Sequence, residues 1–397
     1  MLHVLMISLD TALATQPHSA TRRRHCAYAE RAGSLTVVAY TPPGAGGVIQ
    51  ASPHLTILPT NSRHPLLFAL DAARRAETFA ASHVPVHLIT TQDPFVTGLV
   101  GVWLRDRLGV PLLVQNHSYY FGNRAWLAER PLRNRALTQI GRLVRGRADF
   151  YRTVNRRERA TYVNIGGELA RSAVLPLGTA SAQFAATIPW EQLAALRADL
   201  GLAPDDRVVL WVGYPVAFKR VPLLLRTFRR VLAAEPDARL LLVGDMAQSP
   251  DDLAALARAE GIAERTLMIG PVAHEDLPAY YALADVYAIT SAYEGLPRVL
   301  FEAAAAGLPL AGMRTPGVDE AIRDWDVSPG DANGLLVPDG DTDALAAAIL
   351  KLLRDPALRQ RLGAQGRTHA LAAYDADAYL DAWVDLWRRA VALGRRT

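Results

Sequence analysis

Short apolar runs alternate with longer amphipathic stretches through the first 180 residues of the chain. The apolar runs predict buried β-strands, and the stretches with apolar residues three or four positions apart predict helices. The expected strands are His3–Leu9, Leu35–Tyr40, Leu55–Leu58, Val86–Thr90, Pro111–Gln115 and Phe150–Thr153. The expected helices are His18–Ala32, Pro65–Ser82, Phe95–Leu108 and Leu132–Arg147. This alternation is typical of βα units and a parallel sheet.

The same alternation starts again after a junction of small and polar residues at 174–186. Strands are expected at Val208–Gly213, Arg239–Val243, Thr266–Ile269, Asp285–Ile289 and Leu308–Gly312. Helices are expected at Trp190–Leu200, Pro222–Ala234, Pro250–Glu260 and Leu277–Leu283. The pattern predicts an α/β protein with two parallel-sheet domains in series, facing each other across a cleft.

The chain ends in three helical patterns, expected at Asp341–Leu353, Pro356–Ala372 and Ala378–Leu393. Trp383, Leu386 and Trp387 give the last of them a strongly apolar face. We expect this face to pack onto protein. The alternative is a helix that lies in a membrane interface.

Length and composition support a two-domain protein. A chain of 397 residues suits two domains of ~150–200 residues each. The single cysteine, Cys26, excludes a disulfide framework and a cysteine-rich metal site. The first residues, MLHVLMISLD, predict a strand and lack the pattern of a signal peptide. We therefore expect a cytoplasmic protein.

The net charge of +4 conceals an uneven distribution. Residues 1–180 contain 21 arginines, no lysine and 10 acidic residues, whereas the remainder contains 22 basic and 29 acidic residues. Such a basic half predicts an anionic partner: a phosphorylated substrate, an acidic membrane face or nucleic acid. The alternative is a set of solvated helix faces rich in arginine.

Residues 285–302, DVYAITSAYEGLPRVLFE, combine a buried strand, a polar turn and the start of a helix. The pattern places Glu294 and Gly295 at the carboxyl end of the strand and Glu302 inside the helix. Ligands bind at this edge of open α/β sheets, and a helix N-terminus there favours phosphates. The pair therefore indicates a site for a hydroxyl-rich ligand beside a phosphate. Taken alone, each glutamate is better explained as a solvated loop or first-turn residue.

Two other strand ends carry candidate contacts. In VGYPVAFKR, Gly213 allows close backbone approach, and Lys219 and Arg220 precede a helix, where two cations suit a diphosphate. His117 follows an expected strand in QNHSYYFGN, and both a structural and a functional role stay open for it.

Several motifs are missing or weak. The chain has no G-x-G-x-x-G fingerprint and no G-x-x-x-x-G-K-S/T phosphate loop. Asp339 and Asp341 in VPDGDTDAL resemble a metal-binding pair, but Asp341 is better explained as a turn or helix-cap residue. We expect no metal site.

Together with the segments around it, the glutamate pair in YEGLPRVLFEAAAAGLPL resembles the E-x7-E signature of the retaining glycosyltransferases of family 4. VGYPVAFKRVPLLL is similar to that family's glycine-turn-lysine phosphate element. LMIGPVAHEDLPAYYALADVYAITS and GVDEAIRDWDVSPGDANGLLVPDGDTDALAAAI are similar to the stretch before the glutamates and to the closing block. LPLGTASAQF stands where the family has its inter-domain turn. The resemblance spans nearly the whole chain and is strongest from Val208 to Ile349.

The resemblance implies the GT-B fold, in which two Rossmann-like domains face each other across a cleft. Residues 1–180 would form the acceptor domain and residues 181–377 the nucleotide-sugar donor domain. The C-terminal helix, 378–397, would cross back onto the first domain. No metal or other cofactor is implied, because a helix dipole and basic residues supply the positive charge.

The resemblance also implies roles for individual residues. Lys219 and Arg220 would neutralise the diphosphate of the donor, Glu294 would hold sugar hydroxyls, and Glu302 would bind the ribose. His117 would lie at the sugar and acceptor end of the cleft. The predicted catalytic residues are Glu294, His117 and Lys219; the predicted donor-binding residues are Gly213, Lys219, Arg220, Val272, His274, Glu294, Gly295, Leu296, Pro297, Val299 and Glu302.

The chain departs from the family pattern at three places. Tyr214 stands where the family commonly has arginine, and Arg220 stands where it commonly has glycine. The loop DTALATQPHSATRRRH lacks the usual glycine pair. We expect Arg220 to supply part of the missing charge. We expect Arg22, Arg23 and Arg24 to meet a phosphate of the donor or an acidic acceptor.

The features together predict a retaining hexosyltransferase that moves a sugar from a nucleotide-diphosphate sugar to a glycan or lipid-linked acceptor, as in cell-envelope or exopolysaccharide synthesis. Its arginine-rich domain would make a peripheral contact at the inner face of the membrane, and nucleic acid is not an expected partner. Two alternatives stay open: a nucleotide-sugar epimerase on the same fold, and a nucleotide-sugar-binding relative without catalysis.

Overall fold

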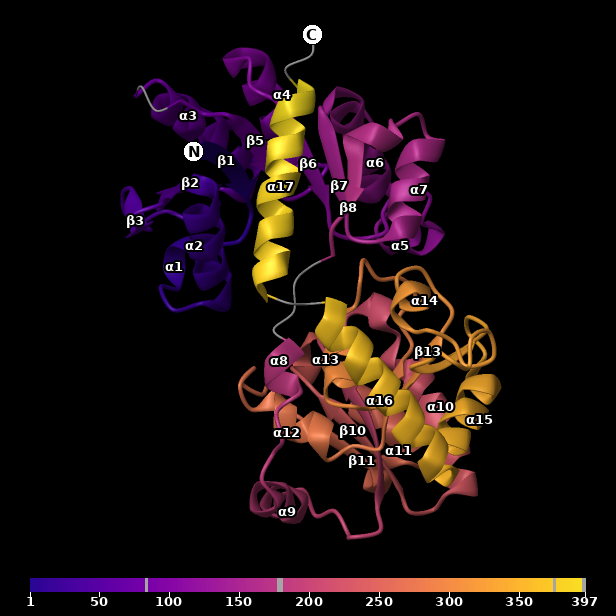
Figure 1. Cartoon of the computed structure of the whole chain (residues 1–397). Helices are drawn as coiled ribbons and strands as arrows, with labels where there is room; N and C mark the ends of the chain where they lie inside the picture. The colour runs from indigo at the N-terminus through magenta and orange to yellow at the C-terminus, as the bar shows by residue number, and fades with distance from the viewer. Residues whose placement is uncertain (83–84, 177–180, 374–375, 395–397) are drawn as a thin grey trace. The chain divides into compact units, whose positions relative to one another are not determined.

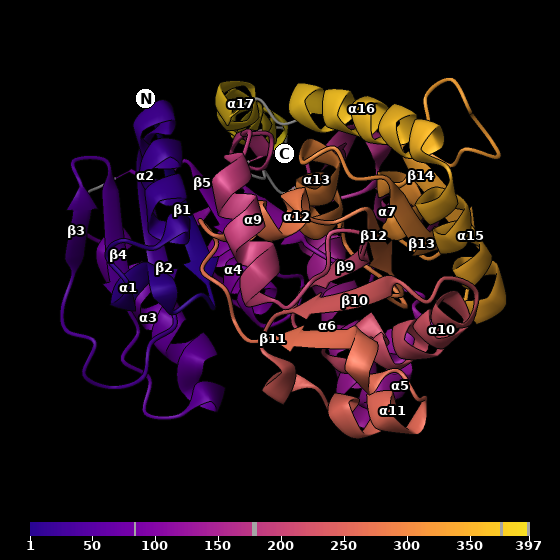
Figure 2. The same cartoon turned by 90° about the horizontal axis from the view of Figure 1, so that it is seen from below.

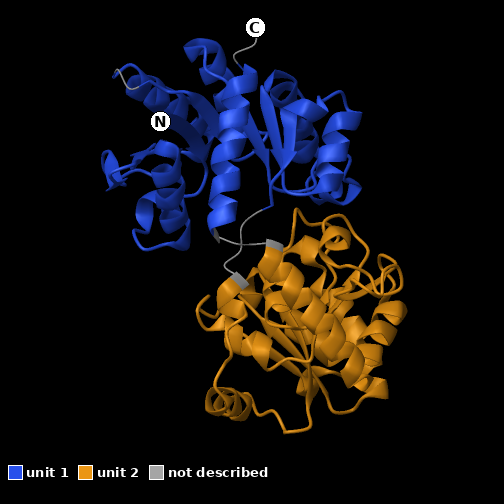
Figure 3. Ribbon diagram, in the orientation of Figure 1, with its two compact units in different colours: residues 1–176, 376–397 blue, residues 177–375 orange. Residues whose placement is uncertain are grey.

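The computed structural model describes residues 1–82, 85–176, 181–373 and 376–394, and the course of the chain is drawn in Figure 1 and, from below, in Figure 2. The chain forms two compact units (Figure 3). Unit 1 comprises residues 1–176 and 376–397, and unit 2 comprises residues 177–375. Residues 177–180, where the inter-domain turn is expected, lie outside the described residues.

Unit 1 contains an eight-stranded sheet in the order β3-β4-β2-β1-β5-β6-β7-β8. Its strands are β1 Leu2–Ser8, β2 Gly33–Ala39, β3 Ile49–Ser52, β4 Leu55–Pro59, β5 Leu88–Thr91, β6 Leu112–Asn116, β7 Phe150–Thr153 and β8 Ser172–Val174. All neighbours pair in parallel except β3 and β4. The sequence pattern did not predict β3, because this antiparallel edge strand is only partly buried and has no apolar run.

The helices of unit 1 cover both faces of its sheet. They are α1 Ala12–Thr15, α2 Ala20–Ala32, α3 Phe68–Ala80, α4 Val96–Leu108, α5 Arg124–Glu129, α6 Pro131–Arg147, α7 Arg156–Asn164 and α17 Ala376–Gly394. One face packs against α2 and α17, and the other packs against α3, α4, α6 and α7. Figure 1 shows α17 lying along the sheet beside β6.

The apolar face of the last helix is buried in the core of unit 1. Trp383, Leu386 and Trp387 are all less than 5% exposed, and both indole rings contact Tyr28 of α2. Burial of each such side chain stabilises the folded chain by about 1.5–3 kcal/mol. The prediction that this face packs onto protein is confirmed, so the apolar face of α17 is not free to enter a membrane.

Unit 2 contains a six-stranded sheet of parallel neighbours in the order β11-β10-β9-β12-β13-β14. The strands are β9 Arg207–Val212, β10 Ala238–Val243, β11 Thr266–Ile269, β12 Val286–Ile289, β13 Leu310–Met313 and β14 Gly334–Val337. Chain order reverses direction between β9 and β12, and ligands of doubly wound sheets bind beside such a reversal. The predicted fold class, two parallel-sheet α/β domains, is confirmed.

The helices of unit 2 are α8 Ser181–Phe184, α9 Trp190–Asp199, α10 Val221–Ala234, α11 Leu253–Ala259, α12 Leu277–Ala282, α13 Arg298–Ala305, α14 Val318–Ala321, α15 Thr342–Arg354 and α16 Pro356–Ala373. Short 3₁₀ turns lie in unit 1 at Pro65–Leu67 and Leu169–Arg171, and in unit 2 at Ala217–Lys219, Met246–Gln248 and Ala263–Arg265. Asp341 caps α15 by accepting a hydrogen bond from the Ala344 amide, as the sequence predicts. Within the described ranges, no helix is both long and apolar enough to cross a membrane.

Candidate functional site

Lys219 and Glu294 meet at the reversal point of the second sheet. Lys219 ends the 3₁₀ turn that follows β9, and Glu294 lies in the turn between β12 and α13. The Lys219 ammonium donates a hydrogen bond to Oε1 of Glu294 at 2.5 Å. The two side chains are only 16% and 11% exposed. Residues 75 positions apart in the sequence therefore form one charged pair.

Backbone and ring contacts fasten the two turns to each other. The Ala292 amide donates to the Phe218 carbonyl at 2.7 Å, and the Thr290 hydroxyl donates to the Lys219 carbonyl at 2.9 Å. The rings of Phe218 and Tyr293 stack with centroids 4.9 Å apart. These contacts order the backbone on both sides of the charged pair, so the Lys219 and Glu294 side chains start from fixed positions.

Gly317 lies at this site but was not among the predicted site residues. The Glu294 amide donates to the Pro316 carbonyl at 2.8 Å, which brings the two segments into contact. Gly317 has φ +83°, and a Cβ atom there would lie 2.4 Å from the Glu294 carbonyl oxygen. Only glycine tolerates both the left-handed backbone and this approach. The signal available in the sequence was the Pro-Gly pair in RTPGV, which follows the expected strand Leu308–Gly312 and is typical of a turn.

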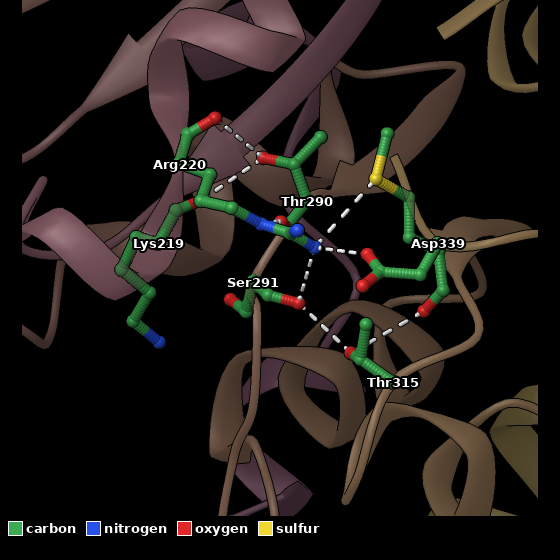
Figure 4. A network of polar contacts seen from close by, with 7 residues as sticks. Lys219, Arg220, Thr290, Ser291, Thr315 and Asp339 are labelled. Carbon is green, nitrogen blue, oxygen red and sulfur yellow. Dashed lines mark hydrogen bonds and ion pairs between the residues drawn. The ribbon is translucent and has the colours of Figure 1, made fainter. Parts of the chain in front are cut away.

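The Arg220 side chain points away from that of Lys219 and contacts residues at the strand ends (Figure 4). Its guanidinium donates to the Thr290 carbonyl at 2.7 Å, to the Ser291 carbonyl at 3.1 Å and to Asp339 Oδ1 at 2.6 Å. Its backbone is left-handed, with φ 50°, which is where glycine is ordinarily favoured. These contacts link the loop before α10 to the ends of β12 and β14. That Arg220 contacts a diphosphate stays a prediction.

Gly213, at the end of β9, is one of a pair of glycines in close contact. A Cβ atom on Gly244, which follows β10, would lie 1.9 Å from the Gly213 carbonyl oxygen. The backbones of the two strand ends can therefore approach this closely only because Gly244 has no side chain. Gly244 was missing from the predicted site residues.

Glu302 lies on α13 and is buried among aromatic groups. Its Oε2 accepts a hydrogen bond from the Tyr281 hydroxyl at 3.0 Å, and its Oε1 lies 3.6 Å from His274 Nε2 and 3.8 Å from Arg298. Burial, followed by the charge of Glu302, raises the pKa of Tyr281 well above its ordinary value, so the hydroxyl stays a donor. His274 is half exposed and packs edge-on against Phe184.

The remaining predicted donor contacts lie around the start of α13. Pro297 is the N-cap of this helix, and its side chain accepts no capping hydrogen bond. Leu296, Val299 and Val272 pack against one side of the sheet core, and Gly295 lies beside Glu294 in the preceding turn. An uncapped helix N-terminus beside the Lys219–Glu294 pair is suited to an anion such as a phosphate.

His117 lies in unit 1, directly after β6. Its Nδ1 is 3.0 Å from an Nη1 of Arg152, which can only donate, so the imidazole proton is on Nε2. Burial, together with the charges of Arg152 and Arg24, lowers the pKa of His117 well below its ordinary value. The imidazole is therefore neutral at physiological pH. Arg152, a charged residue within an apolar strand, was not predicted as part of any site.

Comparison with known proteins agrees with this architecture. Residues 194–369 match the model for glycosyl transferases group 1, and residues 19–178 match the glycosyl transferase 4-like domain. The D-inositol 3-phosphate glycosyltransferase of Kineococcus radiotolerans is 33% identical over 309 residues, which cover 75% of this chain and 70% of that protein. The chain belongs to the group 1 glycosyltransferases.

Solved structures show the same two-domain GT-B architecture. Sucrose-phosphate synthase from Thermosynechococcus elongatus superposes with a TM-score of 0.78 at 24% identity, covering 99% of this chain and 100% of that one. The Anabaena protein HepE, solved with UDP-glucose, gives a TM-score of 0.74 at 16% identity, covering 97% of this chain and 98% of that one. At these identities the likeness shows the fold of this glycosyltransferase.

Proposed function

We propose that this glycosyltransferase is a retaining enzyme of family 4 that transfers a hexose from a nucleotide-diphosphate sugar to an acceptor hydroxyl. The observation that carries the proposal is the Lys219–Glu294 pair, held at 2.5 Å beside the reversal point of the second sheet and the uncapped start of α13. A cation, a carboxylate and a helix N-terminus without a side-chain cap at one point suit a ligand in which a diphosphate joins a hydroxyl-rich sugar.

Each group has a role in this proposal. Lys219, with the first amides of α13, would stabilise the negative charge that develops on the leaving diphosphate. Glu294, with the amides of Gly295 and Leu296, would hold sugar hydroxyls, and Glu302 would accept hydrogen bonds from the ribose. Val272 and His274 would lie against the base. Arg220 would act mainly by holding the strand ends, because its Nε and Nη2 groups already have protein acceptors.

Retention would proceed by front-face attack, in which the departing phosphate takes the proton of the acceptor hydroxyl. Glu294 would then position the sugar and form no covalent bond. His117, neutral and protonated on Nε2, would donate a hydrogen bond at the acceptor end. No metal ion or other cofactor is part of the proposal. The named activity of the Kineococcus relative favours a small polyol acceptor over the glycan or lipid-linked acceptor expected from the sequence.

The proposal is tested by nucleotide-sugar binding and turnover. A thermal-shift screen against UDP-, GDP-, ADP- and dTDP-sugars should reveal a donor, since a ligand at a hundred times its dissociation constant stabilises by about 2.7 kcal/mol. Lys219→Ala and Glu294→Gln should each lower kcat at least a hundredfold without altering the fold. The chain has one other lysine, Lys351, exposed on α15, so Lys351→Ala is the matched control.

The alternatives predict other outcomes. Conversion of the donor to an epimer without any acceptor would favour an epimerase. Tight nucleotide binding without sugar release across many acceptors would favour a non-catalytic relative. Near-normal turnover in both the Lys219 and Glu294 variants would refute the site assignment.

A further inference from the structure

The three consecutive arginines near the start of the chain have different surroundings. Arg22 is buried and donates to the carbonyls of Leu13 and Ala14, at 2.8 and 3.0 Å, which holds the last turn of α1. Arg23 is exposed and donates to the His18 carbonyl. Arg24 is partly exposed, and the described residues offer it no hydrogen bond or ion pair. Of the three, Arg24 is therefore the one whose side chain is not engaged by the described residues.

Arg152 is a buried cation that has no carboxylate partner in the part of the chain that the structure describes. It lies on β7 with 0% exposure, and its guanidinium is 4.9 Å from the centre of the Trp383 ring on α17. One Nη group meets His117, whereas Nε and the other Nη have no hydrogen-bond partner among the described residues. Burial lowers the pKa of Arg152 to about 10. A buried charge is costly unless an opposite charge compensates it, and the described part of unit 1 provides none here.

The two arginines and His117 form one positively charged cluster. The charge of Arg24 is close enough to lower the pKa of both Arg152 and His117. The other groups that interact electrostatically with Arg152 are the hydroxyls of Tyr28 and Tyr379. The cluster therefore combines two cations, a neutral imidazole and two phenols, and of these His117 directly follows β6 and Arg152 lies near the end of β7.

We propose that Arg24, Arg152 and His117 form an anion subsite that binds a phosphate monoester carried by the acceptor. Arg24 and His117 are partly exposed and would contact the phosphate, while Arg152 lies behind His117 and adds its charge. A phosphate dianion would balance both arginines, whereas a carboxylate would balance only one. That the phosphate belongs to an acceptor rests on the proposed function. Binding of an anion at this subsite can be measured without turnover.

Binding of inorganic phosphate to the full-length protein is the first test. Thermal unfolding is followed as sodium phosphate replaces sodium chloride at constant ionic strength, with sodium acetate as a parallel series. We expect stabilisation by phosphate, little by acetate, and at least a tenfold loss of apparent phosphate affinity in Arg24→Gln. Arg23→Gln, which removes the same charge one residue earlier, should bind phosphate as the wild type does.

Variants of Arg152 refine this test. Arg152→Met should also lose phosphate binding, and Arg152→Lys should restore part of it. If Arg152→Met fails to fold, Arg24→Gln still decides the question. Equal responses to phosphate and acetate, or equal losses in the Arg23 and Arg24 variants, would overturn the subsite.

Kinetics then connect the subsite to the acceptor. With a donor identified, inositol and D-inositol 3-phosphate form a matched pair of acceptors that differ by one phosphate. Arg24→Gln should raise KM for the phosphorylated acceptor at least tenfold while leaving kcat and the donor KM unchanged. An equal effect on both acceptors would contradict the proposal. Phosphate binding through Arg24 in a chain that binds no nucleotide sugar would refute the proposed function and leave the subsite standing.

Discussion

Glu158 is a buried carboxyl whose titration should make the stability of unit 1 depend on pH. It lies on α7 with 0% exposure. One oxygen accepts a hydrogen bond from the Asn116 amide at 2.5 Å, and the other has no hydrogen-bond partner among the described residues. Burial raises its pKa from 4.5 to about 8, with a smaller opposing effect from Asn116. The folded chain therefore holds a proton that the unfolded chain releases.

The sign and size of the effect follow from this difference. Between pH 4.5 and about 8 the folded state binds more protons than the unfolded state, so stability decreases as pH rises. Each pH unit in this interval is worth 1.36 kcal/mol at most, which gives a total loss of up to about 5 kcal/mol. Above pH 8 the carboxyl is ionised in both states and the loss stops growing. Glu158→Gln imitates the protonated carboxyl and should abolish this loss.

The assay is urea unfolding, followed by circular dichroism, at pH 5.5, 6.5, 7.5 and 8.5. The difference in unfolding free energy between Glu158→Gln and the wild type should grow toward alkaline pH, because the other ionisable groups cancel in the comparison. Glu168→Gln is the matched control, since Glu168 belongs to the same unit and is 68% exposed. A difference that stays constant with pH, or one that the control shares, would refute the reasoning.

Two further predictions concern individual contacts. Gly317→Ala should destabilise unit 2 by about 1–3 kcal/mol, because alanine strains the left-handed backbone and clashes with the Glu294 carbonyl. The same variant should weaken binding of the donor identified by thermal shift at least tenfold, and donor binding at wild-type strength would contradict the proposed link to Glu294. Asp341→Ala should cost about 1 kcal/mol in urea unfolding by removing the cap of α15, with turnover unchanged. Asp343→Ala, two residues later in the first turn of α15 and exposed, serves as the comparison.

The sequence predicted most of the central strands and the site turns, because their signals are local. Apolar runs such as Val286 to Ile289 must be buried, and glycine and proline fix the turns that follow them. The pair Glu294 and Glu302 was recognisable only together with the segments around it, since its spacing alone is a weak signal. By contrast, β3 and α7 were missed, since a partly exposed edge strand and the arginine-rich helix Arg156–Asn164 have little apolar periodicity.

Other features depended on contacts between distant segments. Arg220 looked like a phosphate ligand beside Lys219, but its side chain reaches strand ends about 70 residues later and Asp339 still further along. Gly244 and Gly317 matter through the backbones that they approach, which no local pattern reveals. Whether a charged side chain faces a ligand or a carbonyl group is decided by its neighbours in space.

By itself, the sequence determined the two parallel-sheet domains, the packing of the last helix and the residues at the strand ends, because hydrophobic periodicity and turn chemistry act over a few residues. Only the tertiary structure decided that Lys219 meets Glu294, that Arg220 holds the strand ends together, and that Arg152 lies beside His117 without a carboxylate partner among the described residues. The physical reason is that electrostatic and hydrogen-bond energies depend on distance and burial in space. Those quantities exist only once the sheets have brought distant segments together.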